Sequence, residues 1–190
     1  MKYDIVLAGV GGQGVLSVAA VIAEAALREG LSVRQSEVHG MSQRGGEVVA
    51  NLRLHTGPVP SDLVPIGGAS LILSLEPLES LRYLRYLSRS GVVVTSVNPV
   101  RNIAAYPALP RVLEAIASLP QAVLIDAEGL ARRSGSVRAA NMALAGAAAR
   151  LLPVSSRVLE QCVSERFASK GPALLAANVE AFRAGWSAAA

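Results

Sequence analysis

The sequence predicts an α/β fold in which a mainly parallel sheet carries helices on both faces and is followed by a helical C-terminal part. Short apolar runs bounded by turn residues alternate with helical stretches, and a glycine turn stands directly behind the first run. This alternation is typical of a Rossmann-like, doubly wound sheet. The predicted strands are Ile5–Ala8, Leu71–Leu75, Val92–Val97 and Ala122–Ile125.

The first helix is predicted from Val15 to Glu29, and Gly30 would close it in the left-handed conformation common at helix C-termini. Pro77 suits the first turn of a second helix, which is predicted to run to Ser88. Glu47 to Leu54 shows strand-like alternation and is predicted to form a hairpin or an edge strand. The remaining predicted helices are Val112–Ser118, Ala127–Arg133 and a helical stretch from Val137 onward, which contains Ser156–Ala168 and breaks at Pro153 and Gly171-Pro172.

Length and composition indicate a single domain spanning residues 1–190. No Pro- or Ser-rich linker divides the chain, and 190 residues are enough for a full core. Hydrophobic residues make up 52% of the chain and charged residues only 17%, below the roughly 25% usual for soluble domains. We therefore expect part of the apolar surface to meet another subunit, or a second copy of this chain when it is isolated.

Charge and hydropathy argue against nucleic-acid binding and against a membrane span. The net charge is +4, but the basic residues are scattered, and aromatic residues, at 4% of the chain, offer no stacking platform for bases. Ile5 to Ala23 carries no charge, yet the glycine turn interrupts it where a strand would pass into a helix. Asp4 and the same turn argue against a signal peptide, so a cytoplasmic protein is expected.

The cysteine and histidine content limits the metal chemistry of this chain. Cys162 is the only cysteine, so no disulfide can form within the chain, which fits a reducing compartment. An iron–sulfur cluster needs about four thiolates, so this chain alone cannot hold one. His39 and His55 are too few for a zinc site without carboxylate help. No metal site is predicted.

The most informative segment is the glycine turn, which we predict to bind a ligand through Gly9, Gly11, Gly12, Gln13 and Gly14. A strand that ends in such a turn and opens a helix leaves backbone N–H groups unpaired, and with the helix dipole they attract a phosphate or carboxylate. Glycine also lets a ligand approach without a Cβ in the way. Gln13 is expected to point out of the turn and donate to the ligand. The alternative is that Gly12 and Gly14 only permit close packing of strand and helix.

A second polar segment, Glu37 to Gly46, follows the predicted second strand Ser32–Gln35. Side chains at the carboxyl end of a parallel strand face the same crevice as the first glycine turn. Arg44 would bind a phosphate or a partner carboxylate, or else bond to nearby backbone carbonyls. Glu37 and His39 would reach the reacting centre or stabilise the loop. The predicted site residues of this segment are Glu37, His39, Gln43, Arg44 and Gly45.

These two segments resemble those of the gamma-type subunits of the 2-oxoacid:ferredoxin oxidoreductases, especially the beta subunit of indolepyruvate ferredoxin oxidoreductase. The resemblance covers nearly the whole chain, although its C-terminal tail is the least specific part. The other similar segments are the strand Glu47–Leu54, the strand and helix start at Leu71–Glu79, and the tail from Leu152-Pro153 through Asn178 to Phe182, Arg183 and Gly185.

The resemblance implies a subunit of a thiamine diphosphate enzyme that decarboxylates 2-oxoacids such as indolepyruvate and other aryl pyruvates. Such an enzyme passes electrons through iron–sulfur clusters to ferredoxin and transfers the acyl group to coenzyme A. A larger alpha subunit would carry the thiamine and the clusters, which fits the single cysteine of this chain. This chain would complete the active-site crevice and bind coenzyme A between the glycine turn and Arg44. No catalytic residue is assigned.

Two alternatives remain from the residues alone: a stand-alone NAD(P)-dependent oxidoreductase and a simple nucleotide-binding module. The glycine turn suits a dinucleotide, and Glu37 lies near the position, about 20 residues beyond the glycines, where an acid holds the ribose hydroxyls. Against hydride transfer, no second domain remains for a substrate, and no Tyr-x-x-x-Lys pair is present. Asn141 is expected to cap or brace a helix near the crevice.

Overall fold

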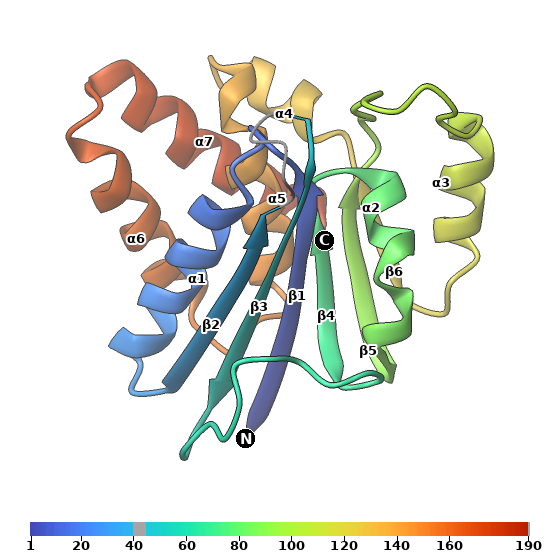
Figure 1. Ribbon diagram of the computed structural model, residues 1–190. Coiled ribbons are helices and arrows are strands. Elements are labelled where there is room, and N and C mark those ends of the chain that lie inside the picture. The colour runs from blue at the N-terminus through green and yellow to red at the C-terminus, as the bar shows by residue number, and fades with distance from the viewer. Residues whose placement is uncertain (40–44, 190) are drawn as a thin grey trace.

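The computed structural model describes residues 1–39 and 45–189 of the chain. Within them, six strands form one sheet with the order β2-β3-β1-β4-β5-β6 (Figure 1): β1 (Lys2–Val10), β2 (Ser32–His39), β3 (Glu47–His55), β4 (Ala69–Ser74), β5 (Leu87–Ser96) and β6 (Ala122–Ile125). β1 is parallel to β4, β4 to β5 and β5 to β6, whereas β3 is antiparallel to both of its neighbours. The predicted mainly parallel sheet is confirmed.

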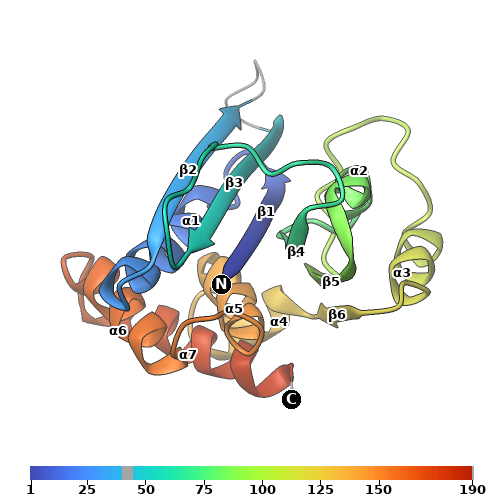
Figure 2. The ribbon, with the colours of Figure 1, turned by 90° about the horizontal axis from the view of Figure 1, so that it is seen from below.

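Helices cover both faces of this sheet, as Figures 1 and 2 show. On one face, α2 (Pro77–Arg82) and α3 (Leu109–Ala117) lie over β4, β5 and β6. The other face carries the remaining helices, which include the predicted helical C-terminal part: α1 (Val15–Arg28), α4 (Ala127–Arg133), α5 (Ala140–Ala149), α6 (Ser156–Ala168) and α7 (Pro172–Ala188). A short 3₁₀ turn, η2 (Val137–Ala139), joins α4 to α5.

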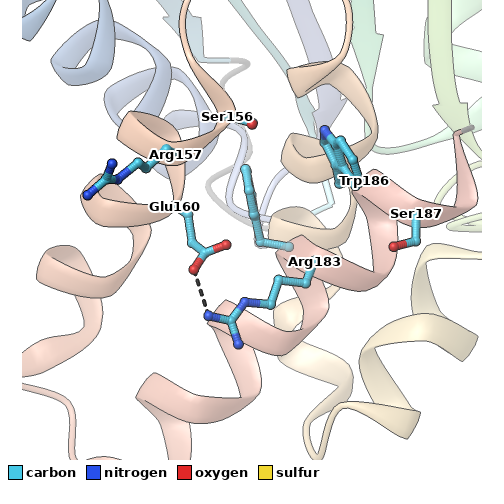
Figure 3. Close-up of a pocket in the computed structure, with 7 residues that line it drawn as sticks. Ser156, Arg157, Glu160, Arg183, Trp186 and Ser187 are labelled. Atoms are coloured by element: carbon cyan, nitrogen blue, oxygen red, sulfur yellow. Dashed lines mark hydrogen bonds and ion pairs between the residues drawn. The ribbon is translucent and has the colours of Figure 1, made fainter.

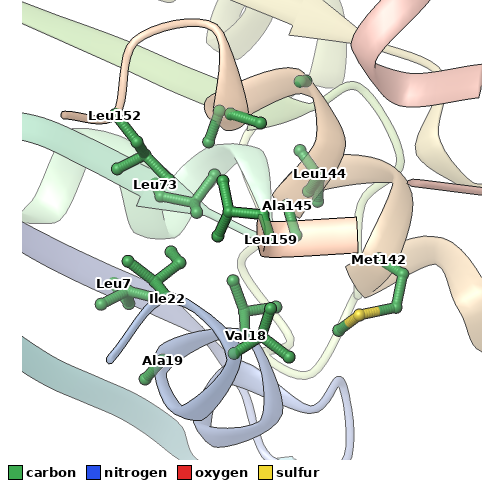
Figure 4. Close-up of a cluster of buried hydrophobic side chains, with 14 of the residues drawn as sticks. Leu7, Val18, Ala19, Ile22, Leu73, Met142, Leu144, Ala145, Leu152 and Leu159 are labelled. Atoms are coloured by element: carbon green, nitrogen blue, oxygen red, sulfur yellow. The ribbon is translucent and has the colours of Figure 1, made fainter. Parts of the chain in front are cut away.

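β1 lies at the centre of the molecule, and its side chains alternate between two hydrophobic clusters. Ile5 and Leu7 belong to the larger cluster with residues of α1, α5, α6 and α7. Figure 4 shows Leu7 near side chains of α1 and α5. Val6 and Ala8 belong to the smaller cluster, which includes Ile116 of α3. Because successive side chains of a strand point to opposite faces, a continuous apolar run is what a strand buried on both faces requires.

β2 and β3 differ from the prediction in extent and in position. β2 continues past Gln35 to His39, because its backbone pairs with β3 as far as His39 opposite Val48. The hairpin alternative for Glu47–Leu54 is confirmed by this antiparallel pairing. The edge-strand alternative is wrong, since β3 lies between β1 and β2 and leaves β2 at the edge. Alternation along one strand does not reveal which strands will flank it.

Several predicted helix bounds are confirmed, although α3 begins three residues before the predicted Val112 and ends one residue before Ser118. α1 begins at Val15, and Gly30 follows its end with a φ of 78°. α4 and α6 have the predicted bounds. The second predicted helix is wrong beyond Arg82, because a 3₁₀ turn, η1 (Leu84–Tyr86), follows and β5 begins at Leu87. Leu87 pairs with Ala69 of β4, so strand pairing replaces the end of that helix.

A buried ion pair anchors the amino-terminal end of β1. The Arg53 guanidinium donates from Nε to Asp4 Oδ1 at 3.0 Å and from Nη2 to Asp4 Oδ2 at 3.1 Å, and both side chains are buried. Its Nη1 also donates to the backbone oxygens of Ser61 and Leu63. The pair therefore joins β1 and β3 to the connection between β3 and β4, with every contact being a charge-assisted hydrogen bond.

Two glycines let α5 and α7 cross with their backbones in contact. A Cβ on Gly185 would overlap the carbonyl oxygen of Ala143, and a Cβ on Gly146 would overlap that of Phe182. Backbone atoms cannot move aside as a flexible side chain can, so a side chain at either position has to push the helices apart. The whole of α5 from Asn141 to Ala149 is buried, which makes this crossing part of the core.

Gly185→Ala should therefore destabilise the fold by overpacking, with a loss of about 1–3 kcal/mol in the free energy of unfolding. Urea unfolding measures this loss. Gly57→Ala is the matched control, because no atom of the residues that the structure describes lies within 4 Å of a Cβ built at Gly57. Equal unfolding midpoints for the two variants would contradict the proposed helix contact.

Candidate functional site

The glycine turn joins β1 to α1 at the carboxyl ends of the parallel strands. Gly12 and Gly14 have φ values of 101° and 85°, a conformation that glycine adopts without strain. Gly9 has a packing role, since a Cβ there would lie 2.9 Å from Gln13 Oε1 and 2.9 Å from a methyl group of Val15. The exposed Gly12 is different, because none of the described residues lies within 4 Å of a Cβ built on it. Gly12 is thus where a ligand can approach the backbone.

The Gln13 side chain binds the protein itself, and the prediction that it points out of the turn is wrong. Its Oε1 accepts from the Val10 N–H at 2.8 Å, and its Nε2 donates to the Leu75 carbonyl at 3.0 Å. These groups lie at the end of β1 and directly after β4, where the ladder between the two strands ends. The amide therefore satisfies both backbone groups and fixes the turn against β4.

The first turn of α1 offers backbone donors beside this bridge. Gly14 is the N-cap residue and has no capping side chain, and among the described residues nothing accepts from the N–H groups of Val15 and Leu16. Unpaired N–H groups at the positive end of a helix dipole attract anions. α1 has 14 residues, so the dipole behind these donors is fully developed.

A cavity of about 370 Å³ adjoins this turn and is lined by residues that follow the carboxyl ends of four parallel strands. Gly12 and Gln13 follow β1, and Leu75 follows β4. The other side is formed by α4, η2 and α5. The remaining lining residues are Ser96, Asn98, Val100, Ala127, Glu128, Val137, Arg138, Ala140, Asn141 and Leu144. The cavity lies where ligands bind in open parallel sheets, at the point from which the chain connections leave in opposite directions.

Asn98 organises the part of the cavity that follows β5 and β6. Its Oδ1 accepts from the Glu128 N–H at 3.0 Å and from the Ser96 hydroxyl at 2.7 Å, and its Nδ2 donates to Asp126 at 2.9 Å. The Asn98 bond, together with the Gly129 N–H, lowers the pKa of Asp126. Asn98 was missed by the sequence prediction, although its place directly after a predicted strand was a signal for it.

Asn141 braces the glycine turn from α5, as expected for this residue. Its Nδ2 lies 3.5 Å from the Gly14 carbonyl oxygen. The side chain is buried, and its Oδ1 has no hydrogen-bond partner among the described residues. A buried acceptor without a partner is uncommon in folded proteins, and a bound water, ion or ligand can supply the missing donor. Asn141 thus marks the wall of the cavity that faces the turn.

Among the described residues of the second predicted segment, Gly45 and Gly46 approach the glycine turn. The Gly11 N–H donates to the Gly46 carbonyl at 2.8 Å, and the Gly45 N–H donates to the Gly11 carbonyl at 3.4 Å. The structure therefore brings Gly45 to Gly11, as predicted. Glu37 lies on edge strand β2, is exposed and does not line the cavity, so its predicted place in a loop facing the crevice is wrong.

His39 is the last residue of β2, so its predicted place in a loop is also wrong. The predictions for Gln43 and Arg44 fall outside the described residues. Asn102 links Gly45 to the connection that follows β5, with Nδ2 2.6 Å from the Gly45 carbonyl oxygen.

The buried carboxylate of Glu76 holds this same connection. Glu76 accepts from the Tyr106 hydroxyl at 2.5 Å and from the Val100 N–H at 3.4 Å, while its other oxygen caps α2 through the Glu79 N–H. Burial, with the bond to Glu76 as second cause, raises the pKa of Tyr106. Burial also raises the pKa of Glu79 to about 7. Since Val100 lines the cavity, Glu76 positions one of its walls.

A second cavity, of about 440 Å³, lies between α6 and α7, far along the chain from the glycine turn (Figure 3). Its lining residues all belong to these two helices, so no strand end contributes to it. Arg183 points to Glu160 and donates to its carboxylate at 2.7 Å. This ion pair neutralises the Arg183 charge within the cavity. The glycine-turn cavity is therefore the stronger candidate for a functional site.

No described helix is long and apolar enough to cross a membrane. In the same part of the chain, the acidic, histidine and cysteine side chains form no group of three or more that could hold a metal ion. Cys162 is fully buried in α6, and burial raises the pKa of its thiol. A buried thiol of raised pKa behaves as a small apolar side chain.

Gln13→Met should destabilise the fold by about 1–3 kcal/mol, because it leaves the Val10 N–H and the Leu75 carbonyl without their partners. Gln121→Met removes an exposed amide that donates to the Ser90 carbonyl at 3.5 Å, and it should change stability by less than about 0.5 kcal/mol. Thermal and urea unfolding measure both variants. Equal losses would show that the Gln13 amide is not a brace.

The chain is similar to known oxidoreductase subunits over its whole length. Residues 4–188 match the family model of pyruvate ferredoxin/flavodoxin oxidoreductase. The indolepyruvate oxidoreductase subunit IorB of Thermococcus kodakarensis is 37% identical over 99% of this chain and 96% of that relative. The pyruvate/ketoisovalerate oxidoreductases common subunit gamma of the same organism is 27% identical over 84% of this chain and 83% of that relative.

Among solved structures, the fold is similar to that of 2-oxoglutarate:ferredoxin oxidoreductase from Magnetococcus marinus, which was solved with 2-oxoglutarate, coenzyme A and succinyl-CoA bound. The TM-score is 0.78 at 23% sequence identity, and the match covers 99% of this chain but only 31% of that chain. This likeness shows the fold alone. The family model over residues 4–188 and the 37% identity with the IorB relative establish that the chain belongs to the pyruvate ferredoxin/flavodoxin oxidoreductase family.

Proposed function

We propose that this chain is the smaller subunit of an indolepyruvate-type 2-oxoacid:ferredoxin oxidoreductase that forms acyl-CoA and CO₂. One observation carries the choice of substrate class. In a single organism, identity is 37% with the indolepyruvate subunit over nearly the full length of both chains, but 27% with the pyruvate/ketoisovalerate gamma subunit over a shorter match. In this proposal residues 1–190 form one domain, and a larger partner subunit carries the thiamine diphosphate.

The thiols of this chain support placing the iron–sulfur clusters on the partner as well. Clusters of this kind are held by about four cysteine thiolates, and this chain has a single cysteine. Cys162 is buried among apolar side chains of the larger cluster. The electrons would then travel to ferredoxin through the partner, and this chain would shape the active-site crevice.

The glycine-turn cavity fits the phosphate groups of coenzyme A. When bound, coenzyme A supplies the thiol that accepts the acyl group. The N–H groups of Val15 and Leu16 stand at the positive end of α1, and Gly12 leaves the backbone open to a ligand. Gln13 would act by holding these donors in place. Gly9, Gly11, Gly14 and Gly45 would give the turn its shape. The ligand contacts predicted for His39, Gln43 and Arg44 stay predictions, whereas Glu37 does not line the cavity.

The interpretation as a stand-alone NAD(P)-dependent oxidoreductase or a simple nucleotide-binding module is less well supported. A dinucleotide site needs an acid that reaches the ribose hydroxyls. Glu37, the residue expected in that role, is exposed on β2 and does not line the cavity. The relatives that cover the whole chain are named as oxidoreductase subunits.

The purified chain alone should not reduce ferredoxin with indolepyruvate and coenzyme A, because it lacks the thiolates for clusters. Co-expression with the larger subunit of the same organism should yield a complex that oxidises indolepyruvate in preference to pyruvate. Ferredoxin reduction and acyl-CoA formation are the readouts. Turnover by the chain alone would refute the proposal, and a complex that prefers pyruvate would refute the substrate class.

Gly12→Val should weaken coenzyme A binding to the complex about tenfold or more, because the side chain keeps phosphate oxygens from their N–H donors. Gly30→Val is the control: Gly30 also has a positive φ and open space around its Cβ, but it lies at the other end of α1. Both variants should lose about 1–3 kcal/mol of stability through backbone strain. Calorimetric titration separates the effect on binding from the effect of strain. Equal dissociation constants of coenzyme A for Gly12→Val and Gly30→Val would contradict a ligand at Gly12.

A further inference from the structure

The cavity at the glycine turn has one cationic side chain among the described residues that line it. Arg138 lies on the 3₁₀ turn η2, on the wall that faces the glycine turn, and Glu128 is the opposing charge. The sequence assigned the cationic contact to Arg44, and it gave no signal for Arg138, whose position depends on how α4 and α5 pack against the sheet.

The Arg138 side chain is exposed and forms no ion pair with the described residues. Arg53 and Arg183, by contrast, each bind a carboxylate of the protein. The backbone under Arg138 is nevertheless fixed, since the neighbouring Ala139 is fully buried and its N–H donates to the Ser136 carbonyl at 2.9 Å. An anchored backbone with a free guanidinium is a suitable arrangement for binding an anion.

A second observation on the same wall points to a ligand. Asn141, one turn beyond Arg138, is 8% exposed, and its Oδ1 has no partner among the described residues. Its Nδ2 lies 3.5 Å from the Gly14 carbonyl oxygen, and Oδ1 is the amide atom without a partner. The wall thus combines a free cation with a buried acceptor, opposite the N–H donors of α1.

We propose that Arg138 binds the diphosphate of the ligand in this cavity, across from Gly12 and the first turn of α1. The inference rests on the proposed function, in which that ligand is coenzyme A. A guanidinium presents a planar fork that matches two phosphate oxygens, and such charge-assisted contacts are stronger than neutral hydrogen bonds. Arg138 and the helix donors would then hold the diphosphate from two sides. The negative charge of Glu128 in the same cavity weakens the attraction between Arg138 and an anion. A ligand with more negative charge is therefore favoured.

The test compares Arg138→Gln with Arg132→Gln in the assembled complex. Arg132 is a matched control, because it is an exposed arginine of the preceding helix α4 that does not line the cavity. Calorimetric titrations use coenzyme A, ADP and pantetheine, the last of which has no phosphate. Arg138→Gln should weaken the binding of coenzyme A and of ADP about tenfold or more and leave the binding of pantetheine unchanged. Arg138→Lys keeps the charge but loses the planar fork, so its dissociation constants should lie between those of the unmodified protein and of Arg138→Gln. Glu128→Gln should lower the dissociation constants of coenzyme A and ADP.

The outcomes separate this inference from the function it rests on. If coenzyme A binds and its dissociation constant is the same for Arg138→Gln and Arg132→Gln, Arg138 is not the phosphate contact, while the proposed function stands. An equal loss for pantetheine would also overturn the inference, since the residue would then act on the shape of the cavity. If neither the chain nor the complex binds coenzyme A or ADP, the ligand assignment fails and the inference fails with it.

Discussion

The side-chain amide of Gln13 is the constraint on which the arrangement of the strand ends depends. It bridges β1 and the residue after β4, the two strands from which the chain departs in opposite directions. α1 leads along one face toward β2, and α2 leads along the other toward β5 (Figure 1). Because the helices diverge there, a gap remains above the strand ends. Because one amide ties both ends, the start of α1 is held beside the cavity.

The opposite wall of the cavity depends on small side chains far along the chain. α5 carries Asn141 and Leu144 of that wall, and α7 packs against α5 backbone to backbone at Gly146 and Gly185. The C-terminal tail therefore does more than close the hydrophobic core. Through its contact with α5, it supports the wall of the cavity that faces the glycine turn.

The sequence predicted the parts of the fold that local pattern controls. Gly30 ends α1 as expected, and α4 and α6 have the predicted bounds, because caps, breaks and apolar spacing act over a few residues. The order of the strands depends on pairing between distant segments. The insertion of β3 between β1 and β2 was therefore only partly predicted, as a hairpin or an edge strand.

The same distinction separates the two halves of the site. The glycine turn was predictable because strand, glycines and helix follow one another directly. Asn98 and Arg138 reach the cavity only through packing, and the orientation of Gln13 depends on the carbonyl of Leu75, which lies far from it in sequence. A polar side chain in a turn can satisfy the protein or a ligand, and sequence alone does not decide between them.

Trp186 on α7 is an intrinsic fluorescence probe that reports on the C-terminal helices. It is the only tryptophan of the chain, it is 40% exposed, and the Arg150 guanidinium lies 4.4 Å from its ring centroid. Its emission will therefore follow the docking of the C-terminal helices, while events at the strand ends leave it largely unchanged. If α7 detaches before the sheet melts, fluorescence and far-ultraviolet circular dichroism will give different unfolding midpoints. The difference between those midpoints measures how independently the helical layer is held.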